Sequence, residues 1–202
     1  GWRPVPEGGR ISLLVPPGIY TVKLSVDGQE LSQPLTIKKD PSSSGSEADI
    51  QAQAAMLAEL RKDLESAAEM VNQIEMIRGQ LESLRSLLPT GADLAPVKTA
   101  ADDLDKKLIE VEDSLIQRKL TGTGQDGVRW PVRLISKINY LANGLSRSDF
   151  GPTTQQREVH AQFKEQLSAH RKRLDEVMSK DLRAFNDLLR SRSLGSVMTG
   201  TF

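Results

Sequence analysis

The feature that most constrains this chain is a long stretch of apolar residues spaced alternately three and four apart. The stretch follows a Ser46–Asp49 capping-box pattern and continues to about Leu88, just before Pro89 and Gly91. Its apolar positions are Leu57, Leu60, Leu64, Ala67, Val71, Ile74, Ile77, Leu81, Leu84 and Leu88. The spacing predicts one helix with a coiled-coil-like seam and a single stammer at Ile74–Ile77. At about 1.5 Å per residue, this helix would be roughly 60 Å long.

A second helix is predicted from about Leu94 to Leu120, after a short link at Pro89–Asp93 that makes the two helices antiparallel neighbours. Its seam repeats without a fault at Leu94, Val97, Ala101, Leu104, Leu108, Val111 and Leu115. The seams of the two helices are therefore expected to meet in reverse order. Leu57 and Leu64 would then face the end of the second helix.

Two further helices complete the predicted bundle. The third starts at Trp130-Pro131, with Leu134, Ile138, Leu141 and Leu145 on one face. The fourth begins at a Thr153–Gln156 capping-box pattern and runs to about Arg190. Its apolar positions are Val159, Phe163, Leu167, Leu174, Val177, Leu182, Phe185 and Leu189. The predicted fold is mainly α, an antiparallel helical bundle in which the first two helices project as a hairpin if the others are shorter.

The residues before the bundle have the pattern of β-strands. Alternation places Tyr20, Val22, Leu24 and Val26 on one face of a strand. Asp27-Gly28 predicts a type I′ turn into the returning strand 29–37, where Pro34 indicates an edge or a bulge. A further short strand is expected at 11–15. Because a lone hairpin is barely stable in water, its apolar face is expected to be covered, and the helices could cover it.

The composition divides the chain into a β segment (1–40), a linker (41–48), the bundle (49–192) and a tail (193–202). The Ser/Gly linker gives no sign of tight docking. With 27 basic and 27 acidic residues, the chain lacks the charge of a nucleic-acid or anionic-lipid binder. No apolar run approaches the ~20 residues that membrane insertion requires. Cysteine is absent, so disulfides and thiolate chemistry are excluded.

No catalytic, cofactor-binding or metal-binding residue is predicted. His160 and His170 lack the Glu-x-x-His pattern of metal sites in bundles and are expected at the surface. The acidic run Glu110–Asp113, with Glu112, is expected on a solvated helix face. The glycines between Gly122 and Gly127 follow a helix rather than a strand, so they indicate a connector and not a dinucleotide loop.

The stretch "LVPPGIYTVKLSVDGQELSQPLTIKKDP" resembles the end of the immunoglobulin-like segment in bacterial proteins with sortilin-like, BNR/Asp-box β-propellers. Those proteins are often described as glycosyl hydrolases. "WPVRLISKINYLANGL" and the helix from "REVHAQF" to "LRSRSL" also resemble their helical C-terminal region, so the likeness covers about 15–194.

The resemblance implies an exported protein, periplasmic, extracellular or bound to the cell surface. It also implies that the hairpin completes an immunoglobulin-like sandwich, with the remaining strands earlier in the same polypeptide or on a separate chain. A hydrolase activity would rest on propeller residues that these 202 residues do not contain, so no catalytic residue is carried over.

Three functions compete. The first is a non-catalytic interaction module of such a propeller protein, one version of which is an accessory subunit of a larger surface assembly. The second is a supporting region of a glycoside-hydrolase-like enzyme whose active site lies in the propeller. The third is a free coiled-coil scaffold with a vestigial hairpin. For the first, the candidate partner contacts lie at the far end of the long helical hairpin, and simple burial within the bundle is the alternative: Leu81, Leu84, Leu88, Leu94 and Val97.

Overall fold

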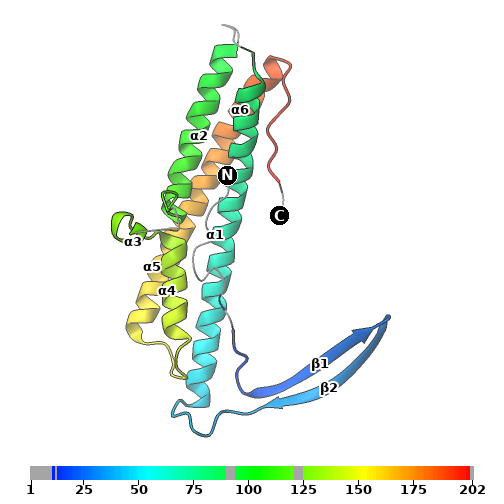
Figure 1. Ribbon diagram of the computed structural model, residues 1–202, viewed down its shortest axis with the longest axis vertical. Coiled ribbons are helices and arrows are strands. Elements are labelled where there is room, and N and C mark those ends of the chain that lie inside the picture. Colours follow the sequence, from blue (N-terminus) through cyan, green and yellow to red (C-terminus); the bar gives the residue numbers. More distant parts are fainter. Residues whose placement is uncertain (1–10, 12, 90–93, 121–124, 201–202) are drawn as a thin grey trace.

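A computed structural model describes residues 11, 13–89, 94–120 and 125–200 and shows a mainly helical protein preceded by a two-stranded antiparallel β-hairpin (Figure 1). The elements are β1 (Gly18–Val26), β2 (Gln29–Ile37), α1 (Glu47–Leu87), α2 (Ala95–Leu115), α3 (Asp126–Arg129), α4 (Leu134–Leu145), α5 (Thr154–Glu176), η2 (Val177–Leu182) and α6 (Arg183–Ser191). This arrangement confirms the predicted fold class, a helical bundle with a small β segment.

The helices form three long rods side by side. The first rod is α1, and the second consists of α2 and α4, which follow each other along α1 (Figure 1). The third is the continuous helix α5–η2–α6, which contacts both other rods. Because the third rod runs beside α2 as well as α4, the first two predicted helices do not project alone from the bundle.

Side-chain pairs between the rods establish the register of α1. Arg78 contacts Glu112 of α2 at 2.7 Å, and Arg85 Nη2 donates to the carbonyl of Ala101 at 3.0 Å. At the other end, Gln53 Nε2 donates to the carbonyl of Leu145 in α4 at 2.8 Å. The α2 helix, with 21 residues against 41 in α1, therefore reaches only the C-terminal half of α1. The expectation that Leu57 and Leu64 face α2 was wrong.

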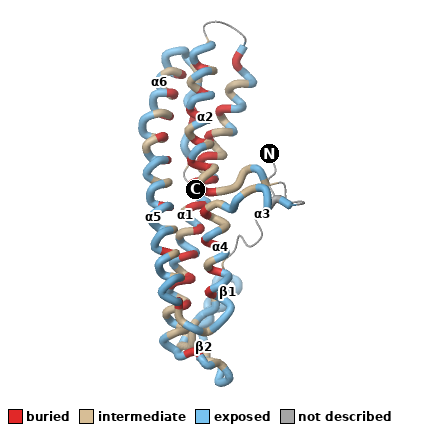
Figure 2. Tube along the Cα trace, turned by 90° about the vertical axis from the view of Figure 1, so that its left-hand side faces the viewer, coloured by how far each residue is buried: buried red, intermediate tan, exposed pale blue. Residues whose placement is uncertain are grey.

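The core is continuous along the whole bundle (Figure 2). Every seam position predicted for α1 is buried except Leu84, which is half-buried. The predicted α2 positions from Val97 to Leu115 are buried as well. Both capping boxes are present, with Ser46 accepting from Asp49 and Thr153 accepting from Gln156. Local sequence chemistry therefore predicted both the seams and the starts of the two longest helices.

Some helix ends differ from their predictions. The α2 helix ends at Leu115 rather than Leu120, and α4 begins at Leu134 rather than at Trp130-Pro131. The predicted fourth helix contains a π-helical segment, Val177–Leu182. Val177 and Leu182 are both buried although they are five residues apart, and the wider π turn keeps both on the core side. The link at 90–93 and the glycines at 122 and 124 lie outside the described residues.

The hairpin has the predicted turn. Asp27 and Gly28 adopt positive φ angles of 51° and 81°, as a type I′ turn requires. The strands pair without a bulge from Gly18–Ile37 to Val26–Gln29. The strand expected at 11–15 was wrong, because Ile11 and Leu13 pack against the helical core instead.

The tail also docks on the bundle, which no periodic pattern had indicated. Val197 is buried, and its N–H and C=O both bond to the Asn186 amide, at 2.8 and 3.0 Å. Met198 makes the same two-bond contact with the Gln80 amide, each at 2.9 Å. Two side-chain amides, one on α6 and one on α1, thus hold an extended segment.

The buried seam predicts that Leu104→Asp destabilises the protein by several kcal/mol, because Leu104 is only 3% exposed and the new carboxylate would have no partner. Thermal unfolding followed by circular dichroism measures the loss. Asp103→Ala is the matched control, since that neighbouring side chain is exposed, and it should leave the melting temperature nearly unchanged. A Leu104→Asp melt equal to that of the parent would contradict the buried seam.

Candidate interaction site

The β-hairpin carries several large apolar side chains that are exposed to solvent. It projects from the lower end of the bundle, and within the described residues its strands make no contact with any helix (Figure 1). Leu24 is 57% exposed and Leu31 is 67% exposed. The helices bury a common apolar core, whereas no described helix packs on the apolar side chains of the hairpin.

The two faces of the hairpin differ in chemistry. Leu24 lies opposite Leu31, and Tyr20 lies opposite Leu35. Since alternate residues share a face, these pairs form one mainly apolar face together with Val22 and Val26, each of which lies opposite a glutamine. The other face carries Lys23 and Glu30, whose charged groups are 3.5 Å apart. Such a two-faced hairpin is typical of a sheet whose apolar face packs on a second layer.

The two edges of the hairpin differ as well. Val26 and Gln29 flank the two-residue turn and therefore form a pair whose N–H and C=O groups point toward each other. Since such pairs alternate with pairs that point outward, Thr21 and Pro34 form an outward pair. Pro34 thus interrupts no bond within the hairpin, which explains the regular register. Its ring lies instead on the outer edge of β2, in agreement with the predicted edge position.

The base of the hairpin is anchored, contrary to the expectation of a loosely attached linker. Gly45 is buried, and a Cβ atom there would collide with the backbone of Asp149 in the α4–α5 turn. Gln53 bonds to the carbonyls of both Leu145 and Ser148 in the same region. Hydrogen bonds from the Ser46 side chain and backbone lower the pKa of Asp49 at the start of α1. The hairpin therefore leaves the bundle from a defined joint.

The predicted partner contacts at the far end of α1 and α2 lie mostly inside the bundle. Leu81, Leu88 and Val97 are buried, and Leu84 and Leu94 are half-buried. This is the arrangement expected from simple burial within the bundle, the alternative interpretation. Leu87 is the exposed apolar residue in this region, with 81% of its surface accessible.

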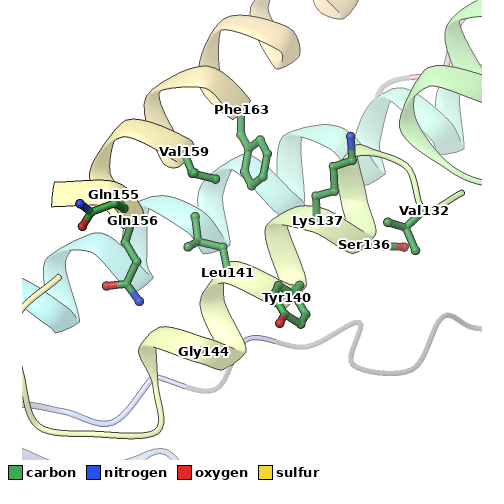
Figure 3. A pocket seen from close by; sticks show the side chains of 10 residues that line it. All are labelled: Val132, Ser136, Lys137, Tyr140, Leu141, Gly144, Gln155, Gln156, Val159 and Phe163. Atoms are coloured by element: carbon green, nitrogen blue, oxygen red, sulfur yellow. The ribbon is translucent and has the colours of Figure 1, made fainter. Parts of the chain in front are cut away.

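A shallow apolar groove of about 610 Å³ lies between α4 and α5 (Figure 3). Leu141 from α4 and Val159 and Phe163 from α5 face one another across it. Tyr140 lies at the rim and is 84% exposed. The apolar part of its lining is Val132, Leu141, Val159 and Phe163, and polar side chains of Ser136, Lys137, Gln155 and Gln156 line the rest.

The expectation of two surface histidines was wrong for His160, which is 6% exposed and lies 2.7 Å from Asp63 of α1. One turn away, Lys164 donates to Glu59, and this hydrogen bond lowers the pKa of the Glu59 carboxyl and raises that of the lysine. His170 is half-buried, and this burial lowers its pKa. The contacts of His160 and Lys164 join α5 to α1, which gives both residues a structural role.

Glu112 likewise differs from its expected place on a solvated face. It is fully buried, and its carboxylate forms ion pairs with Arg78 at 2.7 Å and with Arg118 at 3.4 Å. Burial disfavours the charged form of Arg78, yet its contacts with Asp105 and Glu112 outweigh this and raise its pKa. This ion cluster lies between α1 and α2. We interpret the cluster as a structural contact that aligns α2 along α1.

Among the described residues, no three His, Asp or Glu side chains converge as metal ligands. No described helix is long and apolar enough to cross a membrane. Comparison of the chain with models of known protein families, with curated proteins and with solved structures found no match. The likeness to the propeller proteins therefore stays a prediction from the sequence.

The buried ion cluster predicts that Glu112→Ala lowers the free energy of unfolding by about 1–3 kcal/mol, because Arg78 and Arg118 lose the buried carboxylate that they share. Each arginine keeps a second carboxylate, Asp105 or Asp113, which limits the loss. Urea unfolding measures this change. Glu110→Ala is the matched control on the same helix, and its exposed carboxylate should contribute less than about 1 kcal/mol. Equal effects of the two substitutions would show that the cluster does not hold the register.

The joint at Gly45 predicts that Gly45→Ala destabilises the protein by about 1–3 kcal/mol, because the new methyl group overlaps the backbone at Asp149. Gly79→Ala in α1 is the control. Nothing lies within 4 Å of its new Cβ, so it should raise stability by up to about 1 kcal/mol. A neutral Gly45→Ala in urea unfolding would show that the linker is not docked.

Proposed function

We propose that this chain is a non-catalytic interaction and structural module of an exported β-propeller protein. Its hairpin completes a β-sandwich, and its helical bundle is thereby tethered for assembly or partner binding. The observation that carries this proposal is the exposed apolar face of the hairpin, centred on Leu24 and Leu31, beside a bundle that buries its own seams.

Two further points support an interaction role. Described polar clusters that could suggest catalysis, around His160 and Glu112, are accounted for as contacts between helices. The hairpin also leaves the bundle at the docked joint around Gly45 rather than from a loose tether. A docked joint suits a module that sets the direction of one part of a larger protein relative to another.

The alternative is a supporting region of a glycoside-hydrolase-like enzyme whose active site lies in the propeller. The two functions share the same hairpin and differ in the rest of the protein. Paired acidic residues in a central cleft of the propeller would favour the enzyme, whereas a propeller without such a cleft would favour the interaction module. In either case the 202-residue chain alone should show no glycosidase activity.

Limited proteolysis tests the proposed function. The hairpin residues from Gly18 to Ile37 should be cleaved readily in the isolated 202-residue chain and resist cleavage in the complete exported protein, because the sandwich covers the apolar face only in the latter. Cleavage at the exposed Arg192, which precedes the docked part of the tail, serves as the internal control for protease activity. Equal protection in the two forms would show that the hairpin is self-sufficient and would refute the proposal.

A further inference from the structure

We infer that the hairpin joins its partner through the outer edge of β1 and not through β2, and that the partner is a β-sheet body rather than a second copy of this chain. The inference rests on the proposed function and deepens it by assigning the edge and the kind of partner. It depends on three features of the hairpin: its register, the position of Pro34 and its exposed apolar face.

The outer edge of β1 is fully equipped for pairing. By the alternation described above, Ile19, Thr21, Lys23 and Ser25 direct their N–H and C=O groups away from β2. None of these residues is proline, so each offers both a donor and an acceptor. A second extended strand is the partner that satisfies such a row at the correct spacing, as in β-strand addition.

The outer edge of β2 lacks this capacity. Its outward positions are Glu30, Ser32, Pro34 and Thr36, so the row of donors is broken near its middle. Pro34 has no N–H, and its ring occupies the space where an added strand would lie. A strand added to β2 would lose a hydrogen bond that a strand added to β1 keeps. The difference between the edges therefore favours β1.

The described residues of the chain do not fill the β1 edge. Ile11 and Leu13, which precede β1, pack against the helical core. The sheet contains only β1 and β2. The strand that pairs with β1 must therefore come from outside the described residues.

A second copy of the chain cannot both pair with the β1 edge and cover the apolar face of the hairpin. Two hairpins joined edge to edge through β1 would still expose both apolar faces, including Leu24 and Leu31. Two hairpins packed face to face would leave both β1 edges unpaired. A sandwich body supplies a strand beside β1 and a second sheet over the apolar face at the same time. The combination of an open edge with an exposed face therefore indicates a multi-stranded partner.

Paired proline substitutions test the edge. Lys23 and Ser32 lie directly opposite each other in an outward pair, so proline at either position removes one outer donor and no bond within the hairpin. Lys23→Pro and Ser32→Pro are therefore matched in depth and in face. Lys23→Thr is the control for the contact between Lys23 and Glu30, because it removes the charge and retains the N–H.

The measurement is hydrogen exchange of the segment 24–31 in the complete exported protein, compared with the isolated 202-residue chain. Lys23→Pro should speed exchange roughly tenfold in the complete protein, as expected for losing one pairing bond and its neighbours. Ser32→Pro and Lys23→Thr should leave the exchange rate unchanged. In the isolated chain the two proline variants should behave alike, because no partner strand is present.

The outcomes separate this inference from the proposed function. If the segment exchanges equally fast in the unsubstituted complete protein and in the isolated chain, the proposed function fails and the inference fails with it. If the segment is protected but Ser32→Pro has the larger or an equal effect, the function stands and the assignment of β1 is overturned. If the complete exported protein forms a dimer that Lys23→Pro abolishes, a second copy occupies the edge and the inferred partner is wrong.

Discussion

The apolar seam of α1 is the constraint on which the rest of the structure depends. The helix that carries it is 41 residues long, and the second rod covers the seam only because two separate helices, α2 and α4, lie along it in succession. The third rod stays continuous through α5, η2 and α6, so it bridges the break between those two helices. The buried cluster of Arg78 and Glu112 then fixes how far α2 is shifted along α1. Sliding by one turn would separate these charges within the protein interior, which is unfavourable.

A bundle closed in this way has consequences for the hairpin. The described seam positions of α1 and α2 are almost all buried between the helices, so these seams are not available to cover the strands. The strands point away from the helices (Figure 1), and the end of the linker is fixed on the bundle where Gly45 contacts the α4–α5 turn. The chain therefore combines a self-sufficient helical part with a β segment that needs an outside partner. This division is the physical basis for treating the chain as a connecting module.

The sequence predicted those features that depend on near neighbours in the chain. The seam of α1, the two capping boxes and the Asp27-Gly28 turn each follow from a few consecutive residues. The hairpin site could also be predicted, because alternation alone assigns its apolar face. The edge assignment needed the register, since the orientation of Pro34 depends on which pairs flank the turn.

Predictions failed where a distant partner decides the outcome. Ile11 has the pattern of a strand residue but packs on helices, and Glu112 has the pattern of a surface residue but meets Arg78 in the interior. His160 is buried, and its ring nitrogen forms a hydrogen bond with the Asp63 carboxylate of another helix. No local motif indicates this pairing. The π segment left a visible signal in the five-residue step from Val177 to Leu182, which neither a three- nor a four-residue spacing explains. The docking of Val197 on Asn186 has no corresponding signal in the sequence.

The proline on the outer edge of β2 also affects how the chain behaves when it is alone. An exposed strand edge beside apolar side chains is a template on which further chains can stack into fibrils. Growth of that kind requires two open edges on every unit. Since Pro34 blocks one of them, a chain separated from its partner can add a neighbour on the β1 side only. Two chains joined in this way would present a proline on each outer edge, so aggregation would stop at the pair.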